Sequence, residues 1–150
     1  MEAIQDRLFP LMNCFGCGPV NERGLRLKSY RADEGTVATF LPWPEHDNGG
    51  GYLNGGIIAT LLDCHGASAV LDLAYERDWC EFDGASLGFV TAGLDVHYRR
   101  PTPLTEQLDL TARVLEGSPE EITVHSAIVY DDKVRAEGTA VWKRWRPRPS

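Results

Sequence analysis

The sequence lacks an excess of basic residues. Its 150 residues include 15 Lys and Arg against 22 Asp and Glu, which gives a formal net charge of -7. Because phosphate contacts demand clustered Lys and Arg, a nucleic-acid-binding surface is excluded as the main function. The first thirty residues also lack a long apolar run, so we expect neither a secretory leader nor a membrane span. We therefore expect a cytoplasmic protein with no nucleic-acid or membrane partner.

Cysteines are few, and only two of them are close together. Cys14 and Cys17 form one Cys-x-x-Cys pair, whereas Cys64 and Cys80 stand alone. A zinc knuckle normally needs a second pair, or histidines at similar spacing, and neither follows. We expect reduced thiols packed inward in a glycine-rich loop and predict no metal site. Half of a zinc site is the less favoured alternative.

No repeat, low-complexity segment or linker divides the chain. A content of 43% hydrophobic and 25% charged residues is typical of one globular domain, here residues 1–150. Residues 1–24 are interpreted as an N-terminal segment, with a short amphipathic helix within 1–12 followed by a loop. The prolines in residues 146–150 indicate a tail after the last strand.

Hydrophobic periodicity predicts one long helix among several strands. Residues 25–27 and 37–41 indicate a hairpin around a turn at 33–35, and a helix is expected from Asn54 to about residue 76. Further strands are expected at 87–99, at 107–115 and, in two parts divided at 131–132, at 121–145. This order predicts an α+β fold in which an antiparallel sheet of five or six strands wraps around one long central helix.

The start of the long helix has the features of a site for an acyl carbonyl. Asn54 is expected to cap the helix, and Gly55 and Gly56 let a carbonyl oxygen approach its first N–H groups. The alternative is that the two glycines only permit close packing of the helix against a strand.

Asp63 is the conspicuous charge on this apolar helix. Helical geometry puts it on the same face as Gly56 and Thr60, but about 10 Å from Gly56 along the axis. A base or nucleophile has to come within about 3 Å of its target, so one chain cannot close the site. Two antiparallel helices about a twofold axis could do so, which predicts a homodimer. The alternative is a structural carboxylate at an interface. His65 faces the opposite way and is expected in the core.

Three segments, in this order and spacing, resemble the hotdog-fold thioesterases of the 4-hydroxybenzoyl-CoA thioesterase superfamily, in the phenylacetyl-CoA-type branch. The segments are Cys14-Phe15-Gly16-Cys17-Gly18 with Asn21 and Gly24-Leu25, Asn54-Gly55-Gly56 followed by Asp63, and Leu94-Asp95-Val96-His97-Tyr98-Arg99-Arg100-Pro101. The resemblance implies a sheet wrapped around a long helix and a dimer with two sites at its interface.

The resemblance also implies roles for individual residues. Gly56 matches the glycine whose N–H polarises the thioester carbonyl. Asp63 matches the acidic residue of the neighbouring subunit that acts as base or nucleophile. Arg99 and Arg100 stand where basic residues approach the CoA phosphates, with a solvated strand end as the alternative. Asn54 departs from the pattern, because many relatives have His there. An amide caps a helix but does not titrate near neutrality.

The resulting interpretation is an acyl-CoA thioesterase that forms a homodimer or homotetramer and needs no cofactor. The candidate catalytic residues are Asp63, Gly56 and Asn54. The candidate substrate-binding residues are Gly55, Thr60, Arg99, Arg100 and His46, the last in the loop before the helix. The leading alternative is a non-catalytic acyl-CoA or lipid-binding protein of the same fold. A hydratase or dehydratase is less favoured, because that chemistry usually pairs a His with the acid.

Overall fold

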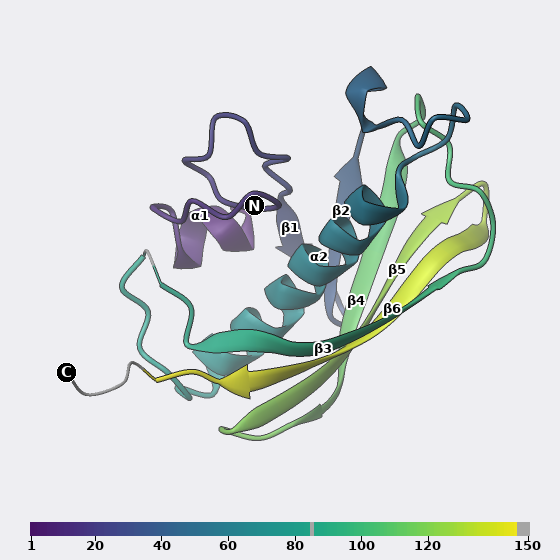
Figure 1. The fold of residues 1–150 in the computed structure, drawn as a ribbon. Helices are drawn as coiled ribbons and strands as arrows, with labels where there is room; N and C mark the ends of the chain where they lie inside the picture. The colour runs from purple at the N-terminus through teal and green to yellow at the C-terminus, as the bar shows by residue number, and fades with distance from the viewer. Residues whose placement is uncertain (85, 147–150) are drawn as a thin grey trace.

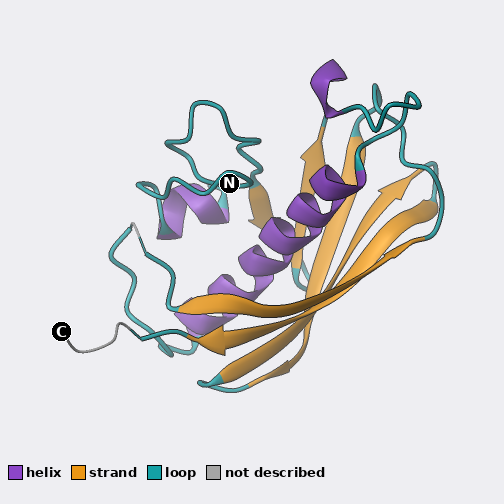
Figure 2. Ribbon diagram, viewed as in Figure 1, coloured by secondary structure: helices purple, strands orange, loops and turns teal. Residues whose placement is uncertain are grey.

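A single long helix, α2 (Gly55–Glu76), lies across one face of an antiparallel sheet (Figure 1). The computed structural model describes residues 1–84 and 86–146, and its six strands follow the order β1-β2-β4-β5-β6-β3. The strands are β1 (Ser29–Arg31), β2 (Thr36–Phe40), β3 (Phe89–Tyr98), β4 (Leu108–Gly117), β5 (Glu121–Tyr130) and β6 (Lys133–Arg144). The curved sheet wraps around the helix (Figure 2), which confirms the predicted α+β architecture.

Helix α2 carries apolar residues on most of its sides, and other elements of the fold cover most of these sides. Leu61, Val70 and Leu71 are fully buried, and the helix packs against all six strands. By length and composition alone α2 would also pass as a membrane span, but most of it is buried inside this domain. Burial of apolar surface on several sides explains why the sequence shows no polar face along the helix.

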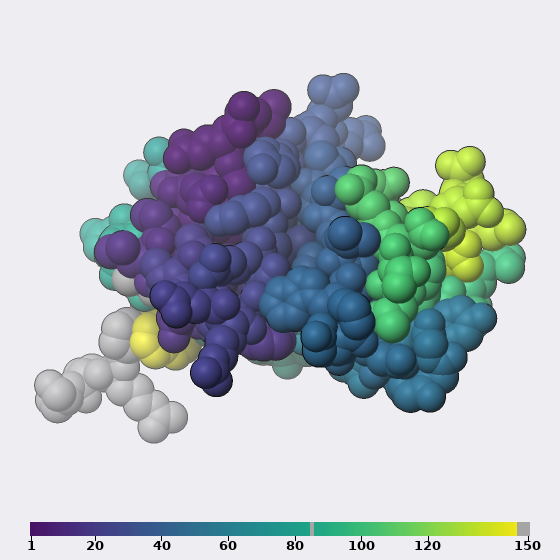
Figure 3. Space-filling model, turned by 90° about the horizontal axis from the view of Figure 1, so that it is seen from above, coloured from purple at the N-terminus to yellow at the C-terminus, as the bar shows by residue number. Residues whose placement is uncertain are grey.

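The N-terminal segment covers the side of α2 that the sheet leaves open. Seen from above, it spreads over this face in purple, beside the blue segment that follows β2 (Figure 3). Its helix, α1 (Ile4–Leu8), is shorter than the helix predicted within residues 1–12. The buried Gln5 side chain ties α1 to β1, since it donates to the Ser29 hydroxyl at 3.0 Å and accepts from the Ser29 N–H at 2.8 Å.

The prediction of a strand at residues 25–27 is wrong. Leu25 and Leu27 are buried, but their N–H groups donate to the carbonyls of Phe15 and Gly16 in the preceding loop, not to a neighbouring strand. Arg26 between them has a φ of +53°, which breaks an extended strand. The alternation of hydrophobic residues therefore reflects burial under the N-terminal loop, and sheet pairing begins at Ser29.

The later strands lie where the periodicity predicts them, and β3 forms an edge of the sheet. Among the described residues β3 pairs only with β6, and a bulge interrupts the pairing between Thr91 and Gly93. After the buried Phe89, most of its side chains are exposed. Such a long unpaired edge can accept another strand, so it marks a surface that a partner could cover.

His65 is in the core, as predicted: its ring nitrogens lie 2.9 Å from the Ser29 hydroxyl and 3.2 Å from the Thr36 carbonyl. Of the predicted tail at 146–150, Arg146 forms a bidentate ion pair with Glu120, and residues 147–150 lie outside the described residues.

The turn between β1 and β2 depends on a glycine. Gly35 has a φ of +72°, and a Cβ there would collide with the Ala112 carbonyl oxygen. We expect Gly35→Ala to lower the free energy of unfolding by more than about 3 kcal/mol, through backbone strain plus the clash. Gly49→Ala is the matched control, because Gly49 has a φ of +94° but open space around it. It should lose only about 1 to 2 kcal/mol. Urea denaturation measures both, and equal losses would contradict the clash.

Candidate functional site

The start of α2 is capped as predicted. The Asn54 side-chain oxygen accepts from the N–H of Gly56 at 2.8 Å and from the N–H of Ile57 at 3.2 Å. The Gly56 N–H, expected to bind the carbonyl, is therefore already occupied within the chain. Among the described residues the Gly55 N–H has no acceptor. A carbonyl oxygen could thus use the Gly55 N–H directly, or share the Gly56 N–H with Asn54.

Tyr98 joins this helix start to the end of β3. Its hydroxyl donates to the Gly55 carbonyl at 2.8 Å, and its ring lies over Gly55. A Cβ at Gly55 would lie 3.4 Å from the Tyr98 hydroxyl, so the glycine permits this close approach. The sequence pattern did not select Tyr98. The one sequence feature that could have indicated a role for Tyr98 is its position directly before Arg99 and Arg100.

Arg99 and Arg100 lie on the surface at the same end of the molecule. Both backbone N–H groups donate to the Arg135 carbonyl, which fixes the chain after β3. The Arg99 side chain donates to Glu137 at 3.1 Å. That bond, after the larger effect of a hydrogen bond from His125, holds the pKa of Glu137 below its usual value. The structure therefore places two basic residues near the helix start, and their role toward CoA stays a prediction.

Asp63 is half-buried and held by a residue of the edge strand. The Thr91 hydroxyl donates to the Asp63 carboxylate at 2.7 Å. Burial raises the pKa of Asp63, the Thr91 hydrogen bond partly opposes this rise, and negative charge at Cys14 adds to it. A carboxylate that is positioned by a neighbour and shifted toward neutrality has the properties of a general base. Thr91 lies far from Asp63 in sequence, and periodicity alone gave no signal for it.

The single chain does not bring Asp63 to the helix start. Gly56 and Asp63 are seven residues apart on the regular helix α2, which corresponds to about 10 Å along its axis. A partner chain therefore remains necessary for any reaction that uses both groups.

Thr60 and His46 have structural roles in the described chain. The Thr60 hydroxyl donates to the Gly56 carbonyl at 3.0 Å, and its methyl group packs near Gly16. His46, a candidate substrate-binding residue in the loop before the helix, is not exposed there. It ends the short 3-10 turn η1 (Pro44–His46) and is buried, with its ring stacked on Trp43 and accepting from the Trp43 N–H at 3.0 Å. Contact of either residue with substrate stays a prediction.

Cys64 joins the Cys14 and Cys17 pair, although it stands alone in the sequence. The three sulfur atoms lie within 4.8 Å of one another, and those of Cys14 and Cys64 are 3.7 Å apart. Hydrogen bonds from the Cys17 thiol, from the Cys64 thiol and from backbone N–H groups lower the pKa of Cys14 to about 2, against the opposing effect of burial. The cluster lies beside Asp63 because Cys64 is the next residue on α2.

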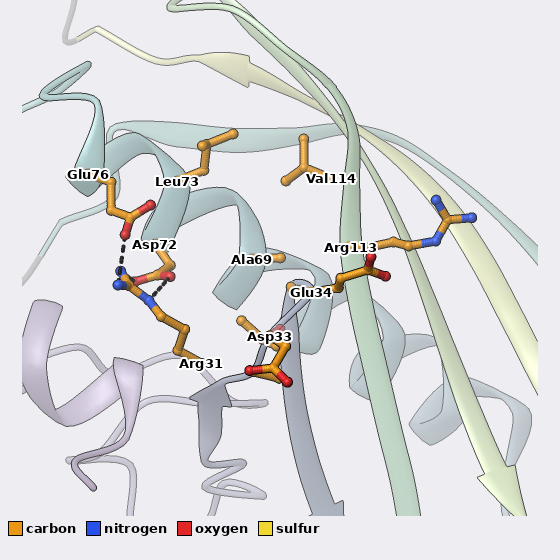
Figure 4. A pocket seen from close by; sticks show the side chains of 12 residues that line it. Arg31, Asp33, Glu34, Ala69, Asp72, Leu73, Glu76, Arg113 and Val114 are labelled. Carbon is orange, nitrogen blue, oxygen red and sulfur yellow. Dashed lines mark hydrogen bonds and ion pairs between the residues drawn. The ribbon is translucent and has the colours of Figure 1, made fainter.

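A cavity of about 550 Å³ opens farther along the helix, between α2 and the β1–β2 turn (Figure 4). Its charged groups are largely paired with each other: Arg31 donates twice to Asp72 at 2.9 Å and contacts Glu76 at 2.7 Å. Asp72 is nine residues beyond Asp63, about 14 Å along the axis. This cavity therefore contains none of the predicted catalytic groups.

Comparisons with known proteins agree with this fold. A family model described as the Thioesterase superfamily matches residues 50–129, which include the helix start and Asp63. A thioesterase superfamily protein from Shewanella loihica PV-4 is 32% identical, with a TM-score of 0.63 over 80% of this chain and 91% of that one. No curated protein matches the sequence.

Two other solved structures support the fold alone. Another thioesterase superfamily protein is 24% identical, with a TM-score of 0.68 over 86% of this chain, which spans only 62% of that one. The PaaI protein from the phenylacetic acid degradation operon of E. coli is 22% identical, with a TM-score of 0.65 over 81% of each chain. The expected hotdog arrangement is thereby confirmed.

The cap at Asn54 can be tested by its effect on stability. Asn54→Ala removes the acceptor of two N–H groups and should lower the free energy of unfolding by about 1 kcal/mol. Asn54→Asp keeps the acceptor and adds a negative charge at the positive end of the helix dipole, so it should stay within about 0.5 kcal/mol of the wild type. Thermal and urea denaturation measure both. An unchanged melting curve for the alanine variant would contradict the capping role.

Proposed function

We propose that this chain, which belongs to the thioesterase superfamily, hydrolyses an acyl-CoA thioester to a free acid and CoA. The observation that carries the proposal is Asp63, a carboxylate half-buried on the core helix and held by Thr91, with a raised pKa. Buried carboxylates are costly unless they are paired or functional, and a hydroxyl is a neutral partner that leaves the charge available.

In the proposed reaction, Asp63 either takes a proton from a water molecule that attacks the thioester carbon or attacks that carbon itself. The carbonyl oxygen becomes negative as the new bond forms. N–H groups at the start of a partner's α2, from Gly55 or Gly56, and the positive end of that helix stabilise this charge. The carbon–sulfur bond then breaks, and CoA leaves as a thiolate that is protonated to the thiol. When water is the attacking group, the acid forms directly and the proton held by Asp63 passes to the thiolate. When Asp63 attacks, a mixed anhydride forms on its carboxylate, and water then hydrolyses it, which releases the acid and restores Asp63.

Arg99 and Arg100 are the proposed contacts of the CoA phosphates. They are exposed at the end of β3, where the Tyr98 hydrogen bond to Gly55 holds this strand end against the helix start. Arginine is suited to phosphate because its planar group offers several N–H donors. This arrangement would let the nucleotide stay at the surface while the acyl group enters between two chains.

We propose a homodimer as the minimal active unit. The exposed edge of β3 carries Thr91, the partner of Asp63, and Tyr98, the partner of Gly55, so both halves of the site adjoin this edge. A twofold axis near β3 would place Asp63 of one chain toward the helix start of the other and produce two equivalent sites.

Substitution of Asp63 tests the chemistry. Asp63→Asn retains an oxygen that accepts from Thr91 but removes the charge, so kcat for thiol release from acyl-CoA should fall at least about 100-fold with the fold retained. A panel of short, medium, long and aromatic acyl-CoAs finds the substrate first. Asp109→Asn, the same change at an exposed position on β4, is the control and should leave kcat unchanged. Near-normal turnover by Asp63→Asn would remove this residue from the mechanism.

Subunit mixing tests whether the site is shared. Asp63→Asn homodimers lack the carboxylate, and Gly56→Val homodimers have an obstructed helix start, so both should be inactive. In a mixed dimer one of the two sites has a normal Asp63 and a normal Gly56, so random mixing should restore about a quarter of the wild-type activity. A site within one chain predicts no recovery, which would refute the shared arrangement.

A binding-only protein is the second candidate, and one observation favours it. The helix start holds Asn54, an amide that cannot titrate near neutrality, and its oxygen occupies the Gly56 N–H. If calorimetry detects binding of acyl-CoAs while no thiol is released above the rate in buffer, hydrolysis is ruled out and this candidate replaces it.

A further inference from the structure

Three cysteines from two distant segments meet against helix α2. Cys14 and Cys17 come from the N-terminal loop and Cys64 from the middle of the helix, yet their sulfur atoms all lie within 4.8 Å of one another. Cys17 and Cys64 are buried and Cys14 is half-buried. Bringing together three thiols from segments about fifty residues apart requires a specific local structure, which the loop provides.

The loop is shaped around these sulfur atoms. A Cβ at Gly16 would collide with the Cys64 sulfur, so only glycine lets the loop approach the helix this closely. The Gly18 N–H donates to the Cys14 carbonyl at 2.8 Å, which closes a tight turn over the Cys-x-x-Cys pair. The loop therefore holds Cys14 and Cys17 at fixed places beside Cys64.

The spacing of the sulfur atoms fits a thiophilic metal ion. With zinc–sulfur bonds of about 2.3 Å, the ligands of a tetrahedral zinc ion lie about 3.8 Å apart. The sulfur atoms of Cys14 and Cys64 are already 3.7 Å apart. The other two sulfur–sulfur distances are at most 4.8 Å, so each has to shorten by no more than about 1 Å to reach the zinc-bound spacing. We propose that Cys14, Cys17 and Cys64 bind one Zn²⁺ ion, with a solvent molecule as the fourth ligand on the half-exposed side at Cys14.

A disulfide explains the arrangement less well. A disulfide joins two sulfur atoms at about 2.05 Å and would leave the third thiol buried without a function. Zinc uses all three thiolates, and its positive charge compensates their burial. The ion would fasten the N-terminal loop to α2 next to Asp63. It would thus help hold one wall of the region around that carboxylate, and its presence does not depend on whether the protein hydrolyses thioesters.

Metal analysis of the whole chain tests the proposal. Protein expressed with added zinc and purified under reducing conditions without chelators should contain about one zinc ion per chain by mass spectrometry. Cys64→Ser should lower the zinc content at least about tenfold. Cys80→Ser is the matched control, because Cys80 is also a buried free cysteine but lies outside the cluster, and it should keep the full content. Equal zinc in the two variants would overturn the assignment.

Two measurements on the wild type cover the case in which Cys64→Ser fails to fold. Titration of reduced apoprotein with Co²⁺ should give thiolate-to-metal charge-transfer absorption together with the visible bands of tetrahedral cobalt. Alkylation followed by peptide mass spectrometry should find Cys14, Cys17 and Cys64 protected with zinc bound and reactive after chelation. The proposal would be overturned if the purified protein contained no metal and gave no cobalt absorption. It would also be overturned if two of these cysteines formed a disulfide in protein purified under reducing conditions.

Discussion

Enclosure of the apolar helix α2 is the constraint on which the rest of this structure depends. The sheet curves around one side and the N-terminal segment covers another, so each polar group on the helix needs a partner from the surrounding elements. His65 hydrogen-bonds to Ser29 and to the Thr36 backbone, and the Ser68 hydroxyl lies 2.8 Å from that of Thr36. These contacts fix how the helix is rotated and how far it is shifted against the sheet.

Asp63, which is half-buried, differs from Asp72, the buried acidic residue on the same helix. Asp72 is neutralised by two arginines, Arg7 at 2.7 Å and Arg31 at 2.9 Å, which makes it a structural ion pair. Within residues 1–84 and 86–146, the one hydrogen-bond partner of the Asp63 side chain is the neutral hydroxyl of Thr91, on the exposed edge strand β3. The same fold thus compensates one carboxylate with charged partners and leaves the other beside the exposed edge strand, where the proposed chemistry requires it.

The N-terminal segment serves both stability and the candidate sites. It buries the outer side of α2, and its loop is joined to the following residues by hydrogen bonds from Leu25 and Leu27. The same loop brings Cys14 and Cys17 to Cys64, one residue beyond Asp63. Packing in this segment therefore determines the surroundings of the carboxylate even though the segment lies outside the matched family region of residues 50–129.

Local pattern in the sequence determined the helix from Gly55, its Asn54 cap, the later strands and the isolation of Asp63 on an apolar face. These features depend on residues within a few positions of one another, so periodicity and capping chemistry are sufficient to predict them. The tertiary structure alone decided that Thr91 holds Asp63, that Tyr98 bonds to Gly55, that His46 is buried and that Cys64 completes a group of three cysteines. The side-chain pairs among these join residues tens of positions apart. Their meeting depends on how the sheet and the loop close around the helix, which no local spacing encodes.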